Sequence, residues 1–146
     1  MRTMRAITLG AAMMSLAACY DVFGPEATGF YSLTTANDHG VPAVVFSRSG
    51  TGAFDVSLVG GTLRLRHDGT FSLQLDYVER DAGSDTFYSQ SFSGTWYQDE
   101  DFVRLQYVDP DTGDWQSVGG FQRYREVEVT LPVSNYGVNV RTVFER

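Results

Sequence analysis

The chain has no lysine, one cysteine and two histidines among its 146 residues. All 11 of its basic residues are arginines, which excludes Schiff-base catalysis by lysine and the phosphate-binding lysine of P-loop enzymes. A single cysteine leaves no disulfide within the chain. Only 20% of the residues are charged and 14% are aromatic, a balance that favours a β-rich globular domain over a disordered chain. The length suits one domain with its own core.

The formal net charge is −7 at pH 7, and removal of a leader containing Arg2 and Arg5 would make it −9. An acidic surface repels the phosphates of nucleic acids and anionic lipid headgroups. We therefore expect neither a nucleic-acid partner nor electrostatic docking on membranes.

His39 and His67 both fall in predicted turns, and no HExxH or comparable metal-ligand spacing accompanies them. A Ser-His-Asp triad stays open, because its members need not be neighbours in sequence, but no GxSxG motif supports one. We therefore expect no catalytic residue, no metal site, no cofactor and no enzymatic activity.

Two groups of acidic residues could suggest chemistry. Asp109–Asp114 alternates acidic residues before a glycine, but it lacks the later bidentate glutamate and the flanking helices of an EF-hand, so an acidic hairpin turn is expected. Paired carboxylates could serve a glycosidase. The carboxylates within the predicted strands fall on the face opposite the apolar one, however, and should face solvent: Asp55, Asp76, Glu126 and Glu128.

The first 18 residues have the layout of a signal peptide. Arg2 and Arg5 precede the apolar stretch Ala6–Ala18, which is too short to span a bilayer. The sequence Leu16-Ala17-Ala18-Cys19 resembles the lipobox of bacterial lipoproteins. An ordinary secretory leader that leaves Cys19 as a free thiol is the alternative.

The lipobox resemblance implies that Cys19 becomes the mature N-terminus and carries a diacylglyceryl thioether. The protein would then be exported and anchored by lipid to a membrane of the bacterial cell envelope. In some Gram-negative lineages an aspartate directly after the cysteine favours the inner membrane; Tyr20 stands there, which favours the outer membrane. Residues 19–28 are predicted to be the lipidated cysteine and a short tether.

Residues Gly61–Tyr77 predict a β-hairpin. Apolar and polar residues alternate in two runs, and Asp68-Gly69 between them suits a tight turn. Gly60-Gly61 is interpreted as a bulge in one long bent strand that includes Ala53–Val59, with a tight turn as the alternative. The further predicted strands are Gly29–Ala36, Val41–Arg48, Thr70–Glu79, Thr86–Tyr97, Phe102–Val108, Trp115–Tyr124, Glu126–Val133 and Gly137–Glu145.

Eight or nine short strands joined by hairpin-length turns predict an antiparallel meander. Closing the meander removes its two open edges. We therefore predict an all-β fold over residues 29–146, a single antiparallel up-and-down β-barrel of about eight strands, with a β-sandwich as the alternative.

Several turn and core motifs resemble the lipocalin-like domain of small bacterial lipoproteins. They are Gly29-Phe30-Tyr31-Ser32-Leu33, Pro42, Gly61-Thr62-Leu63-Arg64-Leu65, Asp68-Gly69-Thr70-Phe71 and Ser93-Gly94-Thr95-Trp96. The family's usual Asn-Gly turn is replaced here by Asn37-Asp38-His39-Gly40. The resemblance implies an eight-stranded barrel on a lipid anchor, and it carries no catalytic residues over to this chain.

The predicted barrel interior is the remaining candidate site. An eight-stranded barrel either fills with side chains or holds one small ligand. Many inward rings favour a filled core, and an inward Gln90 marks either the wet mouth of a pocket or a hydrogen bond to a tyrosine. The candidate ligand-binding residues are Tyr77, Tyr88, Gln90, Trp96 and Tyr107.

The sequence therefore predicts a monomeric, non-enzymatic, lipid-anchored envelope protein. Its barrel would bind a small hydrophobic ligand, or its loops would bind an envelope partner. The alternative is a structural or interaction lipoprotein with a fully packed barrel and no ligand.

Overall fold

A computed structural model describes residues 27–146, so the predicted leader, Cys19 and most of the predicted tether lie outside the described residues. Alternating apolar residues form ten strands and one short 3-10 turn within this range. Their bounds are β1 Gly29–Ala36, β2 His39–Gly40, β3 Ala43–Arg48, β4 Phe54–Leu65, β5 Thr70–Asp81, β6 Ser84–Asp99, β7 Phe102–Val108, β8 Trp115–Arg123, β9 Glu126–Val133, η1 Ser134–Tyr136 and β10 Val138–Glu145.

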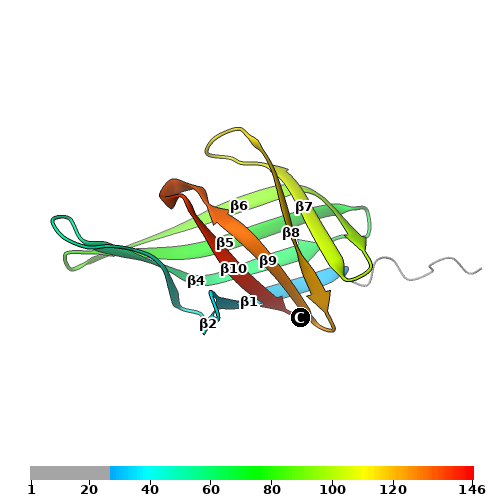
Figure 1. Cartoon of the computed structure of the whole chain (residues 1–146), viewed down its shortest axis with the longest axis horizontal. Helices are drawn as coiled ribbons and strands as arrows, with labels where there is room; N and C mark the ends of the chain where they lie inside the picture. The colour runs from blue at the N-terminus through cyan, green and yellow to red at the C-terminus, as the bar shows by residue number, and fades with distance from the viewer. Residues whose placement is uncertain (1–26) are drawn as a thin grey trace, which may run out of the picture.

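The sheet closes because β1 pairs on both of its edges. One edge pairs with β10, and the other pairs with the C-terminal part of β4, from Gly29 opposite Leu65 to Ser32 opposite Thr62. The closed ring runs β1-β10-β9-β8-β7-β6-β5-β4, and every pairing in it is antiparallel (Figure 1). The predicted eight-stranded antiparallel barrel is confirmed, and the sandwich alternative is wrong because the first and last strands of the ring meet.

β4 is one long strand with a bulge, as predicted. Leu58 pairs with Tyr77 and Gly60 pairs with Asp76, so Val59 is the extra residue. An extra residue shifts the alternation of side chains by one position. The buried positions of β4 change accordingly, from Val56 and Leu58 before the bulge to Leu63 and Leu65 after it.

The long hairpins differ from the predicted boundaries. The predicted strands Thr70–Glu79 and Thr86–Tyr97 are joined by only a two-residue turn, because Asp81 pairs with Ser84 and both Ala82 and Gly83 take positive φ angles. β5 and β6 are therefore longer than predicted, and their hairpin extends to the left of the barrel with that of β3 and β4 (Figure 1). β8 ends at Arg123, because Tyr124 takes φ 55° in the following turn.

Two glycines allow neighbouring strands to approach closely in the barrel wall. A Cβ atom at Gly94 would lie 2.0 Å from the Gln106 carbonyl oxygen, and one at Gly120 would lie 1.7 Å from that of Glu128. No side chain fits at these positions without moving the next strand. They bring β6 against β7 and β8 against β9.

One residue on the outer face is buried against expectation. Ser57 lies two residues after Asp55, so the strand period predicts that it faces solvent, but its side chain is almost fully buried. The strand register places Ser57 between Val44 and Val78, and Phe87 follows Val78 in the same row. These apolar neighbours on the outside of β3–β6 remove Ser57 from solvent.

The barrel has two ends, which we call the N-terminal rim and the distal rim. The N-terminal rim contains residues 27–29, the turns 66–69, 100–101 and 124–125, and residues 145–146. The distal rim contains residues 37–38, 49–53, 82–83, 109–114 and 134–137. The core fills the space between the two rims.

Candidate functional site

The five predicted ligand-binding residues do not converge on one cavity. Tyr77, Trp96 and Tyr107 are buried, whereas Tyr88 and Gln90 are half-buried near the distal rim. Tyr77 stacks on Tyr88, with ring centroids 5.2 Å apart. Tyr107 instead packs edge-on against Phe71 and Phe92, and Trp96 lies at the opposite end of the barrel.

The N-terminal rim is closed by hydrogen bonds. The Trp96 indole N–H donates to the Arg66 carbonyl (2.9 Å), and its backbone N–H donates to Gly69 (2.8 Å). The Gln98 side chain accepts from the Ala27 N–H (2.9 Å) and donates to the Glu100 carbonyl (2.7 Å). These bonds connect the first described residues to two turns, so this end is a rigid plug.

A second amide completes this closure. The Gln122 side chain is buried, accepts a long hydrogen bond from Gln98 (3.4 Å) and donates to the Tyr124 carbonyl (2.9 Å). Its backbone N–H donates to Asp101 (2.7 Å), which joins the β6–β7 turn to β8. Buried amides at this end thus have partners, as buried polar groups require.

The distal rim is closed mainly by aromatic rings. Tyr136, in η1, stacks on Phe46 with ring centroids 4.9 Å apart, and Phe54 packs against both rings at 5.6 and 6.1 Å. We call Phe46, Phe54, Glu79, Tyr88 and Tyr136 the distal cluster. It covers the space between the protruding hairpins and the end of β9.

A short chain of hydroxyl hydrogen bonds runs through the distal cluster. The Tyr136 hydroxyl donates to Glu79 Oε2 (2.7 Å) and lies 3.3 Å from the Tyr88 hydroxyl. Burial raises the pKa of Tyr136, and its hydrogen bonds to Tyr88 and Glu79 raise it further. Burial also raises the pKa of Tyr88. Both phenols are therefore neutral at ordinary pH, so they serve as hydrogen-bond donors and acceptors.

Tyr77 lies beneath this cluster with an unsatisfied hydroxyl. Its Oη atom is buried and has no hydrogen-bond partner among the described residues. Burial raises the pKa of Tyr77, and the nearby Tyr88 and Tyr107 add to the rise. An unpaired buried hydroxyl is costly and deserves an explanation.

Gln90 lies near the distal rim and bonds a carboxylate rather than a tyrosine hydroxyl. Its amide nitrogen donates to Asp111 Oδ2 (2.9 Å) in the β7–β8 loop. Asp109 organises that loop, because its Oδ1 accepts the N–H of Asp111 (2.8 Å) and of Thr112 (3.3 Å). The predicted acidic hairpin turn is confirmed, and its carboxylate bonds the backbone of the turn.

The titratable residues that could form a catalytic or metal site are dispersed. His39 is exposed in β2 beside the distal rim, and His67 is exposed in the β4–β5 turn of the N-terminal rim. Within residues 27–146 no group of three or more histidine, cysteine, aspartate or glutamate residues could hold a metal ion. The structure therefore brings together neither the two histidines nor a cluster of ligands around either.

Three surface cavities lie outside the barrel interior. One of about 520 Å³ is bordered by the start of β1 and the β4–β5 turn, and another of about 520 Å³ lies between the β8–β9 turn and the end of β10. A third, of about 250 Å³, lies over polar residues of β4, β5 and β6. None of the three is lined by any of the five predicted ligand-binding residues.

Sequence reasoning did not identify the distal cluster. Tyr136 follows a predicted strand end and has no alternating pattern around it, so nothing in the sequence directs it over the barrel. Phe46 and Phe54 were assigned to strands, but their contact depends on how far β3 and β4 extend beyond the ring. The one signal in the sequence was that Tyr136 is an isolated aromatic residue in the turn Ser-Asn-Tyr-Gly.

The fold and its closed ends define an eight-stranded antiparallel barrel with a side-chain core. Compared with protein-family models, curated proteins and solved structures, the chain matches none of them. Within the described range, no helix has the length and apolar character needed to cross a membrane.

Proposed function

We propose that this protein is a non-enzymatic, lipid-anchored envelope protein whose packed barrel is a rigid support for a protein-binding surface at its distal half. The proposal retains the lipocalin-like lipoprotein resemblance and the anchor at Cys19. It selects the partner-binding role over a ligand held inside the barrel.

The buried apolar interior is the observation that carries this proposal. The inward side chains of the ring strands are almost all buried and form one apolar cluster. The Tyr107 ring packs edge-on against both Phe71 and Phe92 inside this cluster. Packed interiors leave few voids larger than a water molecule, so recognition falls to the outside.

The distal half offers the chemistry for a basic protein partner. Trp115 and Phe87 are 75% and 71% exposed, and Val44 and Val108 are also exposed there. They form two groups: Val108 pairs with Trp115 beside the aspartates of the β7–β8 loop, and Val44 and Phe87 lie in one row across β3–β6, where the ends of β4 to β6 carry further aspartates. Exposed aromatics within a charged rim are typical of interaction sites. The partner would supply arginine or lysine side chains around an apolar contact.

A small ligand near Tyr77 is the second candidate function. It is favoured by the buried Tyr77 hydroxyl, which has no partner within residues 27–146. A ligand with a hydrogen-bonding group could satisfy that hydroxyl if η1 and the distal cluster moved aside. The ligand would be small, apolar and carry one polar group.

Native mass spectrometry of the gently purified full chain separates the two candidates. The expected mass is that of the processed chain and its lipid anchor, with no further bound molecule. A stoichiometric small-molecule adduct that Tyr77→Phe weakens would instead support the ligand site and contradict the packed-barrel proposal. Tyr124→Phe, whose ring is 85% exposed, is the matched control.

The anchor is tested separately. Cys19→Ala should abolish metabolic labelling by fatty acid and release the protein from membrane fractions that are washed at high salt. The substitution removes the residue that would carry the acyl chains, and two or three such chains hold a protein on a membrane far more firmly than one. Unchanged labelling and retention would contradict an anchor at Cys19.

A further inference from the structure

The net charge of the whole chain conceals an uneven distribution along the barrel. In residues 27–146, the half next to the N-terminal rim has a formal charge of −1 and the distal half has −6. The first half contains Arg64, Arg66, Arg104, Arg123, Arg125 and Arg146 against Asp68, Asp99, Glu100, Asp101, Glu126, Glu128 and Glu145. The distal half contains Arg48, Arg80 and Arg141 against Asp38, Asp55, Asp76, Glu79, Asp81, Asp85, Asp109, Asp111 and Asp114.

Five of the six arginines in the half next to the N-terminal rim lie in one continuous sector. The strand order places the β8–β9 turn, the end of β10, the start of β1 and the β4–β5 turn next to one another. We call Arg64, Arg66, Arg123, Arg125 and Arg146 the arginine sector. The acidic turn at Glu100–Asp101 lies on the opposite side of the ring, between β6 and β7.

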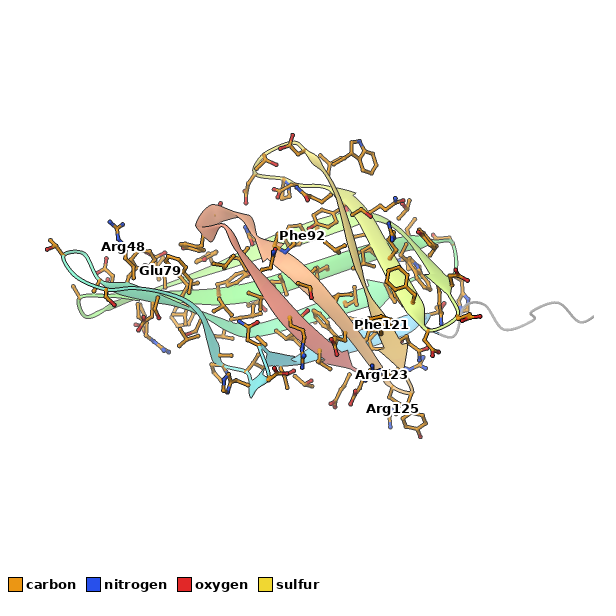
Figure 2. The ribbon with its side chains drawn as sticks, viewed as in Figure 1. Arg48, Glu79, Phe92, Phe121, Arg123 and Arg125 are labelled. Carbon is orange, nitrogen blue, oxygen red and sulfur yellow. The ribbon has the colours of Figure 1, made fainter. Side chains whose placement is uncertain are left out.

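Arg146 joins the two parts of this sector. Its backbone N–H donates to the Arg125 carbonyl (3.1 Å), and its guanidinium Nη1 donates to the Thr28 carbonyl (2.9 Å). The turn that carries Arg123 and Arg125 is therefore fixed against the start of β1. Figure 2 shows Arg123 and Arg125 at this end, and Arg48 at the opposite end of the molecule.

The sector also contains two cavities and two exposed rings. Arg64 and Arg66 border the cavity beside β1, and Arg123, Arg125 and Arg146 border the cavity beside β10. Phe30 adjoins the first cavity with 58% of its surface exposed, and the almost fully exposed Tyr124 adjoins the second. Each hollow thus combines guanidinium groups with an aromatic ring, and its arginines outnumber its carboxylates, which are Asp68 in the first and Glu126 and Glu145 in the second.

We propose that the arginine sector docks on the headgroups of an anionic phospholipid bilayer. Guanidinium groups bind phosphate oxygens with paired hydrogen bonds, and aromatic rings settle at the membrane interface. The start of β1 lies within the sector, and Cys19 is eight residues before Ala27. Eight residues span at most about 28 Å, so an anchored chain holds this rim near the bilayer.

Docking deepens the proposed function by orienting the barrel. With the arginine sector against the membrane, the acidic distal half points away from it, toward the partner proposed above. The docking proposal requires no lipid on Cys19, so its test removes the anchor. The lipid anchor at Cys19 and docking through the arginine sector can therefore be contradicted separately.

The test uses the full chain with Cys19→Ala and measures co-sedimentation with vesicles. We expect binding to vesicles of equal parts phosphatidylglycerol and phosphatidylcholine that is sensitive to salt, as exposed charge interactions are. Adding Arg123→Gln and Arg125→Gln should weaken that salt-sensitive binding by about 25-fold, at about fivefold for each guanidinium. Any binding through the leader, which carries Arg2 and Arg5, is the same in all variants, so the comparison between variants cancels it.

Arg48→Gln with Arg80→Gln is the matched control, because it removes the same charge from the distal half. This pair should leave binding unchanged, and circular dichroism should show that both pairs keep the fold. Equal loss from the two pairs, or no loss from either, would overturn the proposal. Equal binding to pure phosphatidylcholine vesicles, or complete competition by millimolar inorganic phosphate, would overturn it as well.

Discussion

The two rims of the barrel close the same core by different physical means. The N-terminal rim is held by directional hydrogen bonds from Trp96, Gln98 and Gln122 to backbone groups of the turns. The distal rim is held by the packing of Phe46, Phe54 and Tyr136 and has one hydroxyl chain. Packed rings can rearrange at lower cost than a network of buried hydrogen bonds. The comparison identifies the N-terminal rim as the fixed end and the distal rim as the adaptable one.

The largest effect should follow removal of the indole at the N-terminal rim. Trp96 is 4% exposed and bonds the β4–β5 turn, so Trp96→Ala should lower the free energy of unfolding by about 3–5 kcal/mol. Urea denaturation measures the change. Trp115→Ala, the same substitution at an exposed residue, should change the free energy by less than about 0.5 kcal/mol. A similar loss of unfolding free energy from the two variants would contradict the claim that Trp96 closes the N-terminal rim.

Alkaline pH should weaken the barrel through Tyr107. Burial, with a smaller effect from Asp109, raises the pKa of Tyr107 to about 12. A folded-state pKa above the unfolded value of about 10 means that the neutral phenol stabilises the fold below pH 10, and that this contribution is lost as the pH rises through about 12. Tyr107→Phe should reduce the loss of stability over that interval, as followed by circular dichroism. The exposed Tyr124→Phe should leave the pH dependence unchanged, and an equal effect from both would contradict this assignment.

A smaller effect is expected from the hydroxyl chain at the distal rim. Tyr136→Phe keeps the stacked ring but removes the hydrogen bonds to Glu79 and Tyr88. The free energy of unfolding should fall by about 1 kcal/mol. Hydrogen exchange should quicken at the distal rim while the N-terminal rim keeps its protection. Equal acceleration at both rims would show that they do not close the barrel independently.

The smallest effect should come from Tyr77, just beneath the distal cluster. Its hydroxyl has no hydrogen-bond partner in the described part of the chain, so Tyr77→Phe removes an unsatisfied buried group. Stability in urea should stay the same or rise by up to about 1 kcal/mol. A loss larger than 1 kcal/mol would mean that the hydroxyl has a bound partner, and it would strengthen the ligand interpretation over the packed barrel.

The difference between the rims also explains how much of this protein could be predicted from its sequence. Alternation and turn residues were enough for the closed antiparallel ring, and Gly60-Gly61 indicated the bulge that changes the phase of β4. Both signals are local, because the alternation of apolar and polar residues lies within each strand and the residue types that a turn needs lie within each turn. The inward positions of the five candidate residues follow from the same period.

What could not be predicted depends on contacts between distant segments. Tyr136 meets Phe46 and Glu79 only because η1 folds back over hairpins that extend beyond the ring. The arginine sector is likewise assembled from two separate turns and the C-terminal residue, so a sum of charges along the sequence does not reveal it. Ser57 shows the same limit, since its burial depends on the row formed by Val44 and Val78.

The central claim is that the barrel interior is a filled core, and a thermal shift with benzene tests it most directly. Leu73 is buried in the middle of β5, and Leu73→Ala should open an apolar cavity of the kind that binds benzene. We predict that saturating benzene raises the Tm of this variant, as a ligand that binds only the folded state must, and leaves the Tm of the wild-type chain unchanged. A benzene-dependent rise in the wild-type Tm would contradict the claim, because it would reveal a cavity already present in the barrel.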